Sequence, residues 1–163
     1  MEIGYCFAFR YSDFEFKMLY IASDHAGYQL KEELDEYLES LGYKFEDLGA
    51  YESDLQDDYP DFALNLAKKV TQEESVGILI CGTGQGMCAT ANKIKGIRAV
   101  LAYDEFTARA AKEHLDANVL CLGGRTTDLE IAKKIVKTWL ETPFSGEERH
   151  IRRLKKIEGI ENN

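Results

Sequence analysis

The chain has 163 residues, 45% of them hydrophobic, which is enough for one well-packed domain and short for two. Its 29 acidic residues outnumber its 20 Lys and Arg residues, and the net charge of -9 disfavours nucleic acid or an anionic membrane as a partner. No apolar run of about 18 residues predicts a membrane span, and the N-terminus lacks a signal-peptide pattern. The four cysteines show neither a C-x-x-C pair nor metal-ligand spacing, so we expect a reduced, cytoplasmic protein without structural zinc.

Residues 1–17 carry aliphatic and aromatic side chains at every second position from Ile3 to Tyr11, as a strand would. Met18 could itself be the initiator, which would make the preceding residues a dispensable tail. We therefore treat residues 1–17 as an N-terminal extension whose order the pattern leaves open. Residues 18–163 are expected to form a single domain with a C-terminal helical tail.

From Met18 onward, segments with the pattern of strands alternate with segments that show helical spacing. Short apolar runs predict five strands, at residues 19–22, 43–48, 76–81, 99–103 and 119–122. Apolar residues at helical spacing predict helices at residues 30–41, 62–70, from a glycine-rich turn to about 93, and 107–114. A capping box, Thr127-x-x-Glu130, predicts a further helix with a core face of Ile131, Ile135, Val136, Trp139 and Leu140.

This regular alternation predicts an α/β fold, namely a doubly wound parallel sheet of about five strands with helices on both faces. In such sheets the ligand binds beyond the carboxyl ends of the strands. The residues that follow the predicted strands are therefore candidates for the site. They are Asp24 and His25, then Cys81, Gly82 and Thr83, and finally Gly123, Gly124 and Arg125.

The third predicted strand ends on Cys81 and is followed by three alternate glycines, Gly82, Gly84 and Gly86. Backbone N–H groups of such a turn can point at a phosphate or a developing oxyanion, because no side chains stand in the way. The same positive potential would favour the thiolate of Cys81. This order of strand, thiol and amide cradle indicates chemistry on a phosphorylated or carbonyl-bearing small molecule.

Two other interpretations of this segment stay open on the residues alone. Cysteine is often only a small buried residue, and a glycine-rich turn between a strand and a helix is common in α/β proteins. The spacing matches neither the Rossmann G-x-G-x-x-G nor a Walker A motif. Asp104 nevertheless lies about one βαβ unit downstream, where the ribose-binding acid of a dinucleotide module would lie.

Because the chain is acidic overall, an anionic ligand must be met by a local cluster of positive groups. Its three histidines are His25, His114 and His150, and His25 directly follows the first predicted strand. A basic cluster at residues 149–153 surrounds His150. Such a cluster is ordinarily a solvated helix face, but in this chain it is also the clearest candidate for a phosphate clamp.

Together, these motifs resemble those of the ribose-5-phosphate isomerase B and galactose-6-phosphate isomerase (LacAB) family. The resemblance covers residues 18–157 and rests on motifs that occur in order: Ala22-Ser23-Asp24-His25-Ala26-Gly27, Asp58-Tyr59-Pro60, Ile80-Cys81-Gly82-Thr83-Gly84, Ala91-Asn92-Lys93, Gly96-Ile97-Arg98-Ala99, Glu113-His114, Asp116-Ala117-Asn118-Val119, Gly123-Gly124-Arg125, and Arg149-His150 with Arg153. It implies a three-layer Rossmann-like fold, a homodimer or a dimer of dimers, and metal-free isomerisation of a phosphosugar without a cofactor. It also argues against NAD.

The resemblance implies roles for the residues at the strand ends. Cys81 would be the base that removes a proton next to the sugar carbonyl, as in members of the cysteine type. Thr83 and the amides of residues 82–86 would stabilise the enediolate. Asp24 and His114 would handle the hydroxyl protons and open the furanose ring.

The remaining roles concern binding of the substrate. Tyr59 would line the pocket, and the phosphate would be held by four positive side chains: His25, Arg125, Arg149 and Arg153. In the family, the residues equivalent to His114 and Arg125 come from the neighbouring subunit, so two chains would share each site.

One position departs from the family pattern. Members usually have asparagine after the catalytic histidine, whereas this chain has Leu115, whose side chain cannot form a hydrogen bond.

The expected reaction is the interconversion of ribose 5-phosphate and ribulose 5-phosphate, a step of the pentose phosphate pathway. Two alternatives stay open: a six-carbon substrate such as allose or galactose 6-phosphate, and a phosphosugar-binding module without catalysis.

Overall fold

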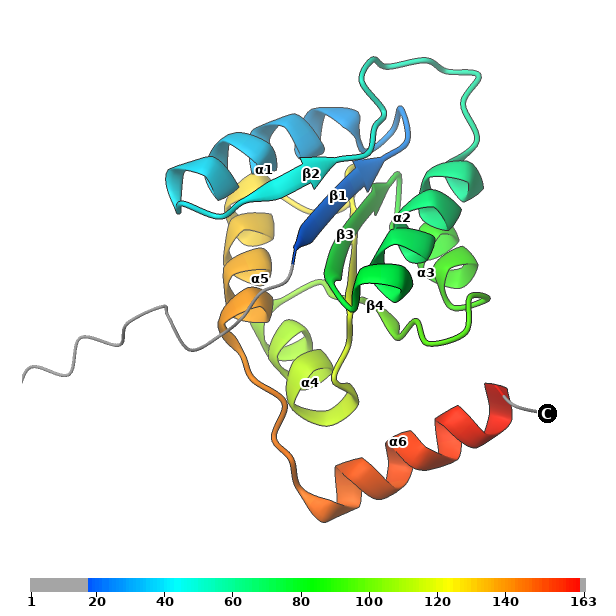
Figure 1. The fold of residues 1–163 in the computed structure, drawn as a ribbon. Helices are drawn as coiled ribbons and strands as arrows, with labels where there is room; N and C mark the ends of the chain where they lie inside the picture. Colours follow the sequence, from blue (N-terminus) through cyan, green and yellow to red (C-terminus); the bar gives the residue numbers. More distant parts are fainter. Residues whose placement is uncertain (1–17, 162–163) are drawn as a thin grey trace, which may run out of the picture.

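The computed structural model describes residues 18–161, so the alternation predicted within residues 1–17 lies outside the described residues. Five strands and six helices follow one another in the described part of the chain (Figure 1). The strands are β1 (Leu19–Ser23), β2 (Phe45–Asp47), β3 (Val76–Cys81), β4 (Ala99–Leu101) and β5 (Val119–Gly123). The helices are α1 (Tyr28–Ser40), α2 (Tyr59–Glu73), α3 (Gln85–Ala91), α4 (Glu105–Leu115), α5 (Leu129–Glu141) and α6 (Glu148–Glu161).

The five strands are parallel and lie in the order β2-β1-β3-β5-β4. β1, β3 and β5 occupy the centre, where almost every residue is buried, as expected of strands that are covered on both faces. β2 and β4 lie at the edges and are shorter than the predicted strands. An edge strand pairs with one neighbour only, so fewer of its residues are held in the ladder than its apolar pattern suggests.

Helices cover both faces of the sheet and give the molecule three layers (Figure 1). α1, α4 and α5 bury their apolar residues on one face, and Leu34 and Trp139 are fully buried there. α2 and α3 pack on the other face, where Leu66 and Met87 are fully buried. The predicted doubly wound α/β fold with about five strands is therefore confirmed.

The start and the core face of α5 differ from the prediction. The N-cap is Asp128 and not Thr127, because the Asp128 carboxylate accepts a hydrogen bond from the Glu130 N–H at 2.9 Å. The prediction of Ile131 as a core residue is also wrong, since its side chain is 46% exposed. The buried stripe begins at Ala132, one helical position later, and then follows the predicted residues.

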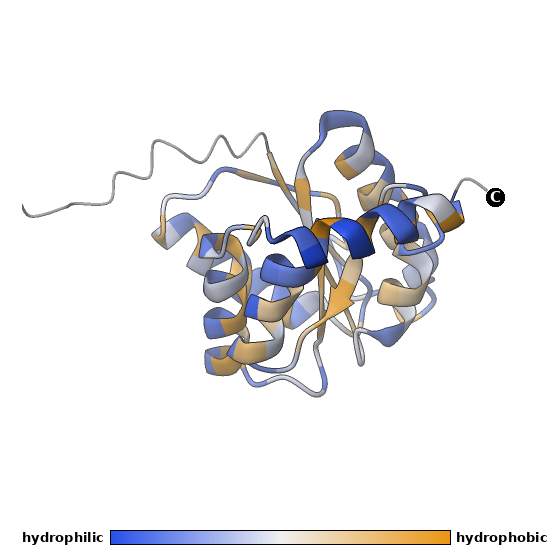
Figure 2. Cartoon of the chain, turned by 90° about the horizontal axis from the view of Figure 1, so that it is seen from below, coloured by the Kyte–Doolittle hydropathy of each residue, from blue (hydrophilic) through white to orange (hydrophobic). Residues whose placement is uncertain are grey.

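α6 lies below the sheet, outside the three layers (Figure 1). Its buried residues are His150 and Leu154, and it contacts α4. Seen from below in Figure 2, α6 is a mainly hydrophilic helix that lies across this side of the molecule. No helix within residues 18–161 combines the length and the apolar character that a membrane span requires.

Candidate active site

The carboxyl ends of β1, β3 and β5 meet at one edge of the sheet, where backbone hydrogen bonds join their loops. The Asp24 N–H, after β1, donates to the Ile80 carbonyl at 3.2 Å, and the Gly124 N–H, after β5, donates to the Cys81 carbonyl at 2.8 Å. The chain reverses its direction across the sheet between β1 and β3, and such a point is the ligand crevice of open α/β sheets. The strand ends that the sequence indicated are thus brought together.

The glycine-rich turn after β3 leaves a row of backbone donors open. Within the described part of the chain, the N–H groups of residues 83–86 donate to no protein acceptor. Gly84 has a φ of 75°, and a Cβ at this position would lie 2.9 Å from the Leu122 backbone. A Cβ on Gly86 would lie 2.8 Å from the Tyr59 ring. Glycine at Gly84 therefore lets the turn form, and glycine at Gly86 lets the Tyr59 ring pack against it.

Cys81 is the last residue of β3 and stands at the base of this turn. Its side chain belongs to the core between the sheet and the helices α2 and α3, and it is 4% exposed. Bulk water therefore has little access to the thiol.

Asp24 contributes a buried carboxyl, 5% exposed, immediately after β1. Burial raises the pKa of this carboxyl above its ordinary value, although the Gly27 N–H donates to Oδ1 at 2.9 Å and opposes the shift. A carboxyl with a raised pKa retains its proton to higher pH, so it can exchange that proton with a bound ligand more readily.

Arg125 lies beside the glycine-rich turn of its own chain. A Cβ on Gly82 would lie 3.6 Å from both Cδ and Nη1 of Arg125. Among residues 18–161 its guanidinium has no hydrogen-bond or ion-pair partner, so its donors are open to an anion. β5 ends at the same edge as β3, so Arg125 borders the turn of its own chain, whereas the resemblance implied a residue supplied by a neighbouring subunit; that assignment stays a prediction.

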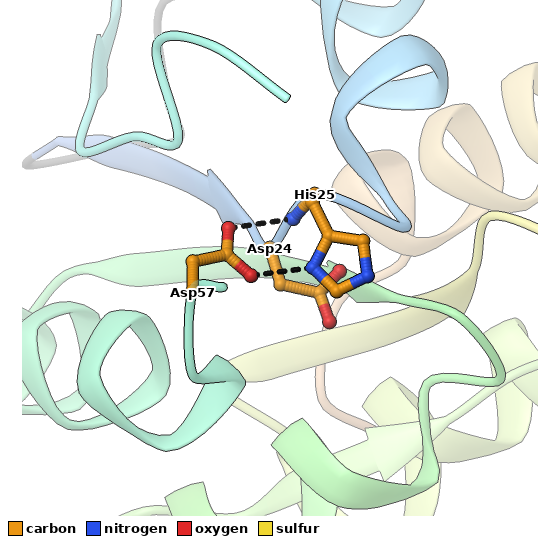
Figure 3. A group of neighbouring side chains, drawn as sticks. All are labelled: Asp24, His25 and Asp57. Atoms are coloured by element: carbon orange, nitrogen blue, oxygen red, sulfur yellow. Dashed lines mark hydrogen bonds and ion pairs between the residues drawn. The ribbon is translucent and has the colours of Figure 1, made fainter. Parts of the chain in front are cut away.

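His25 lies next to Asp24 and is held by Asp57, a residue that the sequence did not indicate (Figure 3). The His25 backbone N–H donates to Asp57 Oδ2 at 2.8 Å, and its ring Nδ1 lies 2.6 Å from Oδ1. The side chains of His25 and Asp57 are 21% and 11% exposed. Asp57 lies in the loop between β2 and α2, outside any periodic pattern, and no sequence signal pairs it with a residue 32 positions earlier.

An open cavity of about 760 Å³ adjoins His25 and Arg125. The first turns of α1, the loop between β2 and α2, and the start of α5 form its other walls. Its volume lies within the usual range of small-molecule sites. Glu32 and Glu33 of α1 also line it, so the cavity has both a cationic and an acidic wall.

Asp24, His25 and Asp57 could together offer a metal ion three ligand atoms that lie within 4.8 Å of one another. The His25 Nδ1, however, is already paired with Asp57.

Asp104, the candidate for a ribose-binding acid in a dinucleotide site, is the N-cap of α4 and accepts a hydrogen bond from the Thr107 N–H at 2.7 Å. Its carboxylate is used within its own helix, which argues against a dinucleotide site.

The other predicted residues, His114, Arg149 and Arg153, lie toward the opposite edge of the sheet. α4 begins beyond the carboxyl end of β4 and returns to the amino end of β5, and His114 is in its last turn. The His114 ring lies 4.4 Å from that of His150, measured between centroids, which places the start of α6 at this end. His150 is buried, and its Nδ1 hydrogen-bonds to Ser145 Oγ at 2.7 Å. His114, Arg149 and Arg153 are exposed.

Within one chain, the predicted residues thus lie in two groups at opposite edges of the sheet. The carboxyl-edge group comprises Asp24, His25, Tyr59, Cys81, Gly82, Thr83, Gly84, Gly86 and Arg125. The amino-edge group comprises His114, Arg149 and Arg153. The 11 residues of α4, at 1.5 Å per residue, span about 16 Å. Within one chain, the two groups therefore cannot touch the same small ligand.

The fold and the carboxyl-edge group define a Rossmann-like α/β protein in which a thiol, a buried carboxyl and a turn with open N–H groups meet at a topological switch point. The family model described as Ribose/Galactose Isomerase matches residues 19–157. The chain belongs to this family, and the resemblance seen in its motifs is confirmed.

Named relatives are similar to this chain over most of their length. Ribose-5-phosphate isomerase B of Escherichia coli K12 is 40% identical over 146 residues, which are 89% of this chain and 97% of the relative. The structure of the Clostridium thermocellum ribose-5-phosphate isomerase B has a TM-score of 0.86 and 44% identity, and the match covers 89% of this chain and 97% of that one. The Mycoplasma genitalium ribose-5-phosphate isomerase B, solved with bound ribulose-5-phosphate, has the same TM-score, 0.86, and 44% identity, with coverage of 90% and 97%.

Proposed function

We propose that this chain is an aldose-ketose isomerase that interconverts ribose 5-phosphate and ribulose 5-phosphate. The observation that carries the proposal is the meeting of Cys81, the buried carboxyl of Asp24 and the open N–H groups of residues 83–86 at one edge of the sheet. The relatives support it, since they are named for this activity and one was solved with ribulose-5-phosphate bound.

The reaction moves a proton between two neighbouring carbons. In the aldose-to-ketose direction, the Cys81 thiolate takes the proton from C2, and the C1 carbonyl oxygen becomes an enediolate oxygen. The N–H groups of residues 83–86, with the Thr83 hydroxyl, can donate to that oxygen where its charge develops. The thiol then returns the proton to C1, while the hydroxyl proton on O2 passes to O1. Atoms and electrons balance, so the reaction needs no cofactor.

Asp24 and His114 serve the proton transfers between oxygens in this proposal. Opening the furanose ring requires one group that takes the proton from the anomeric hydroxyl and another that gives a proton to the ring oxygen. The raised pKa of Asp24 suits such an exchange. His114 is the imidazole that is exposed and so can reach a ligand on another chain.

The phosphate is assigned to His25 and Arg125 of one chain and to Arg149 and Arg153 of a second. His25 and Arg125 border the same cavity. Arginine suits a phosphate because its planar donors match the oxygens of the anion. In a chain with a net charge of -9, such a local positive set is needed to attract a sugar phosphate.

We also propose that the working unit is a homodimer in which the amino-edge group of each chain completes the carboxyl-edge group of its partner. Twofold symmetry creates two such sites from a single self-complementary contact. α6 carries five Arg and Lys residues, and the cavity next to His25 carries Glu32 and Glu33, so their charges are complementary.

The proposed place of action is the cytoplasm. Cys81, Cys88 and Cys121, the cysteines of the described part of the chain, are free thiols. Free thiols persist in a reducing compartment, and a base that acts as a thiolate depends on staying reduced.

An assay of the purified full chain against ribose 5-phosphate, allose 6-phosphate and galactose 6-phosphate tests the proposal. We expect the highest kcat/KM for ribose 5-phosphate and, in D₂O, solvent deuterium at C1 of the ribulose 5-phosphate formed, detected by NMR. Binding of ribose 5-phosphate with neither turnover nor exchange would show a binding module. A higher kcat/KM for a six-carbon sugar would contradict the assigned substrate while leaving the isomerase chemistry in place.

A further inference from the structure

Asp57 holds His25 through both of its carboxylate oxygens (Figure 3). One oxygen accepts the His25 backbone N–H at 2.8 Å, and the other lies 2.6 Å from the ring Nδ1. A rotation about either side-chain bond of His25 would break the ring contact while the backbone contact stayed in place. These two contacts together therefore set the orientation of the imidazole, which a single surface ion pair would not do.

The contacts with Asp57 also decide which ring nitrogen of His25 is available to a ligand. An ionised carboxylate can only accept hydrogen bonds, so the proton between Asp57 and His25 lies on Nδ1. Nε2 is then the nitrogen left for a ligand. His25 borders the same cavity as Arg125, whose guanidinium has no partner within residues 18–161. Carboxylates orient histidines in the same way at metal and catalytic sites.

Charge gives a second reason to connect this contact with an anion. A free carboxylate beside the site would repel a phosphate dianion. Both Asp57 oxygens face donors of His25, so the negative charge is directed at the ring. When Nε2 also carries a proton and donates a hydrogen bond to a phosphate oxygen, the Asp57 carboxylate balances the positive charge of the ring.

The loop that carries Asp57 has contacts on both sides of this residue. The Asp57 N–H donates to the Asp54 carbonyl at 3.1 Å, and two residues later Tyr59 begins α2 and stands against Gly86. The contact with His25 thus also fastens this loop to the turn after β1. A test must therefore separate the direction of His25 from simple attachment of the loop.

We propose that Asp57 is a positioning residue for the substrate phosphate: it fixes the His25 ring with Nδ1 protonated, so that Nε2 faces the phosphate group. Asp57 itself does not touch the substrate. The inference rests on the proposed function, in which His25 is a phosphate ligand.

Steady-state kinetics of the full-length Asp57→Asn and Asp61→Asn variants test the proposal. Asparagine has one acceptor oxygen and cannot serve both donors of His25. For Asp57→Asn we expect the KM for ribose 5-phosphate and the inhibition constant of inorganic phosphate to rise together by about tenfold, with kcat within about threefold of wild type. Asp61→Asn removes the same charge from an exposed position in the first turn of α2 and should change neither constant.

A His25→Ala variant separates the two levels of the inference. We expect it to weaken phosphate inhibition, and Asp57→Asn should add no further effect in that background. If His25→Ala leaves phosphate inhibition unchanged, the assignment of His25 to the phosphate fails. If His25→Ala weakens inhibition but Asp57→Asn behaves like Asp61→Asn, or lowers kcat alone, the role of Asp57 is overturned.

A spectroscopic measurement on the wild-type chain reports the tautomer of the His25 ring directly. The chain has three histidines, so the ¹⁵N signals of the His25 ring can be assigned by comparison with His25→Ala. We expect the neutral ring to carry its proton on Nδ1 at high pH. A neutral ring protonated on Nε2, with Nδ1 bare, would overturn the proposal.

Discussion

Two cysteines of the same core show how position determines the chemistry of a residue. Cys121 lies in the middle of β5 and is fully buried, and this burial raises the pKa of its thiol well above the ordinary value. Cys81 is nearly as buried but ends its strand, and the N–H groups of residues 83–86 follow it. The turn, and not the burial, therefore distinguishes the proposed base from a packing residue.

Replacing Cys81 by alanine should remove the proposed base while leaving the cationic side chains in place. We expect kcat on ribose 5-phosphate to fall by about 10²–10⁴ with little change in KM. Cys88→Ala is the matched control, because it removes a thiol from α3 without touching the turn, and it should retain activity. A Cys81→Ala chain with activity within a few-fold of wild type would rule out the assignment.

Leu115 is the residue that the resemblance to the family singled out, because asparagine is expected at this position. It ends α4, and its carbonyl accepts a hydrogen bond from Arg98 Nε at 2.8 Å, so the backbone beside His114 is well held. Its side chain offers no donor, and a missing donor to an oxyanion costs about 10²–10³ in kcat. We expect Leu115→Asn to raise turnover of ribose 5-phosphate several-fold in the same assay. A lower kcat/KM would instead mean that leucine fits a differently shaped pocket.

At the scale of elements, a buried ammonium joins α1 to the end of β2. Lys31 is fully buried, and its Nζ lies 2.6 Å from Asp47 Oδ2, 2.7 Å from Glu32 Oε1 and 3.4 Å from Asp35 Oδ2. Three carboxylates thus surround one positive charge, and Oδ1 of Asp35 is buried without a hydrogen-bond partner. Burial and the neighbouring Asp47 and Glu32 raise the pKa of Asp35 to about 6 despite Lys31.

This raised pKa predicts the sign of a pH effect on stability. The folded chain binds the Asp35 proton more tightly than the unfolded chain does, so the contribution of Asp35 to stability rises as the pH falls through 6. We expect Asp35→Asn to be more stable than wild type at pH 8 and the gap to narrow at pH 5, measured by urea unfolding. Glu36→Gln, on the exposed face of α1, should show no such change. A gap of the same size at both pH values would contradict the assignment.

At the scale of the whole molecule, the two groups of candidate residues lie at opposite edges of one sheet. This arrangement predicts complementation between inactive chains. A mixture of equal amounts of Cys81→Ala and His114→Ala chains should form heterodimers with one intact site each. Random exchange then restores about a quarter of wild-type activity if the sites act independently. No recovery after verified subunit exchange would place all of these residues in one subunit.

Much of the fold and most of the carboxyl-edge group could be predicted from the sequence, because both depend on local order along the chain. Strand and helix periods reflect which face of each segment is buried, and residues after parallel strands share one edge of the sheet by topology. The position of Asp24, Cys81 and Arg125 at one edge of the sheet could therefore be predicted without coordinates. The same local rules located α5 and α4, with errors of a residue or two at their ends.

The tertiary structure decided what depends on contacts between distant segments. The insertion of β5 between β3 and β4 leaves β4 at an edge, which shortens it. The return of α4 across the sheet carries His114 away from Cys81, and the loop before α2 brings Asp57 to His25 across 32 positions. The spacing of apolar residues does not predict such contacts, because it reports which face of a segment is buried and not which residues that face contacts.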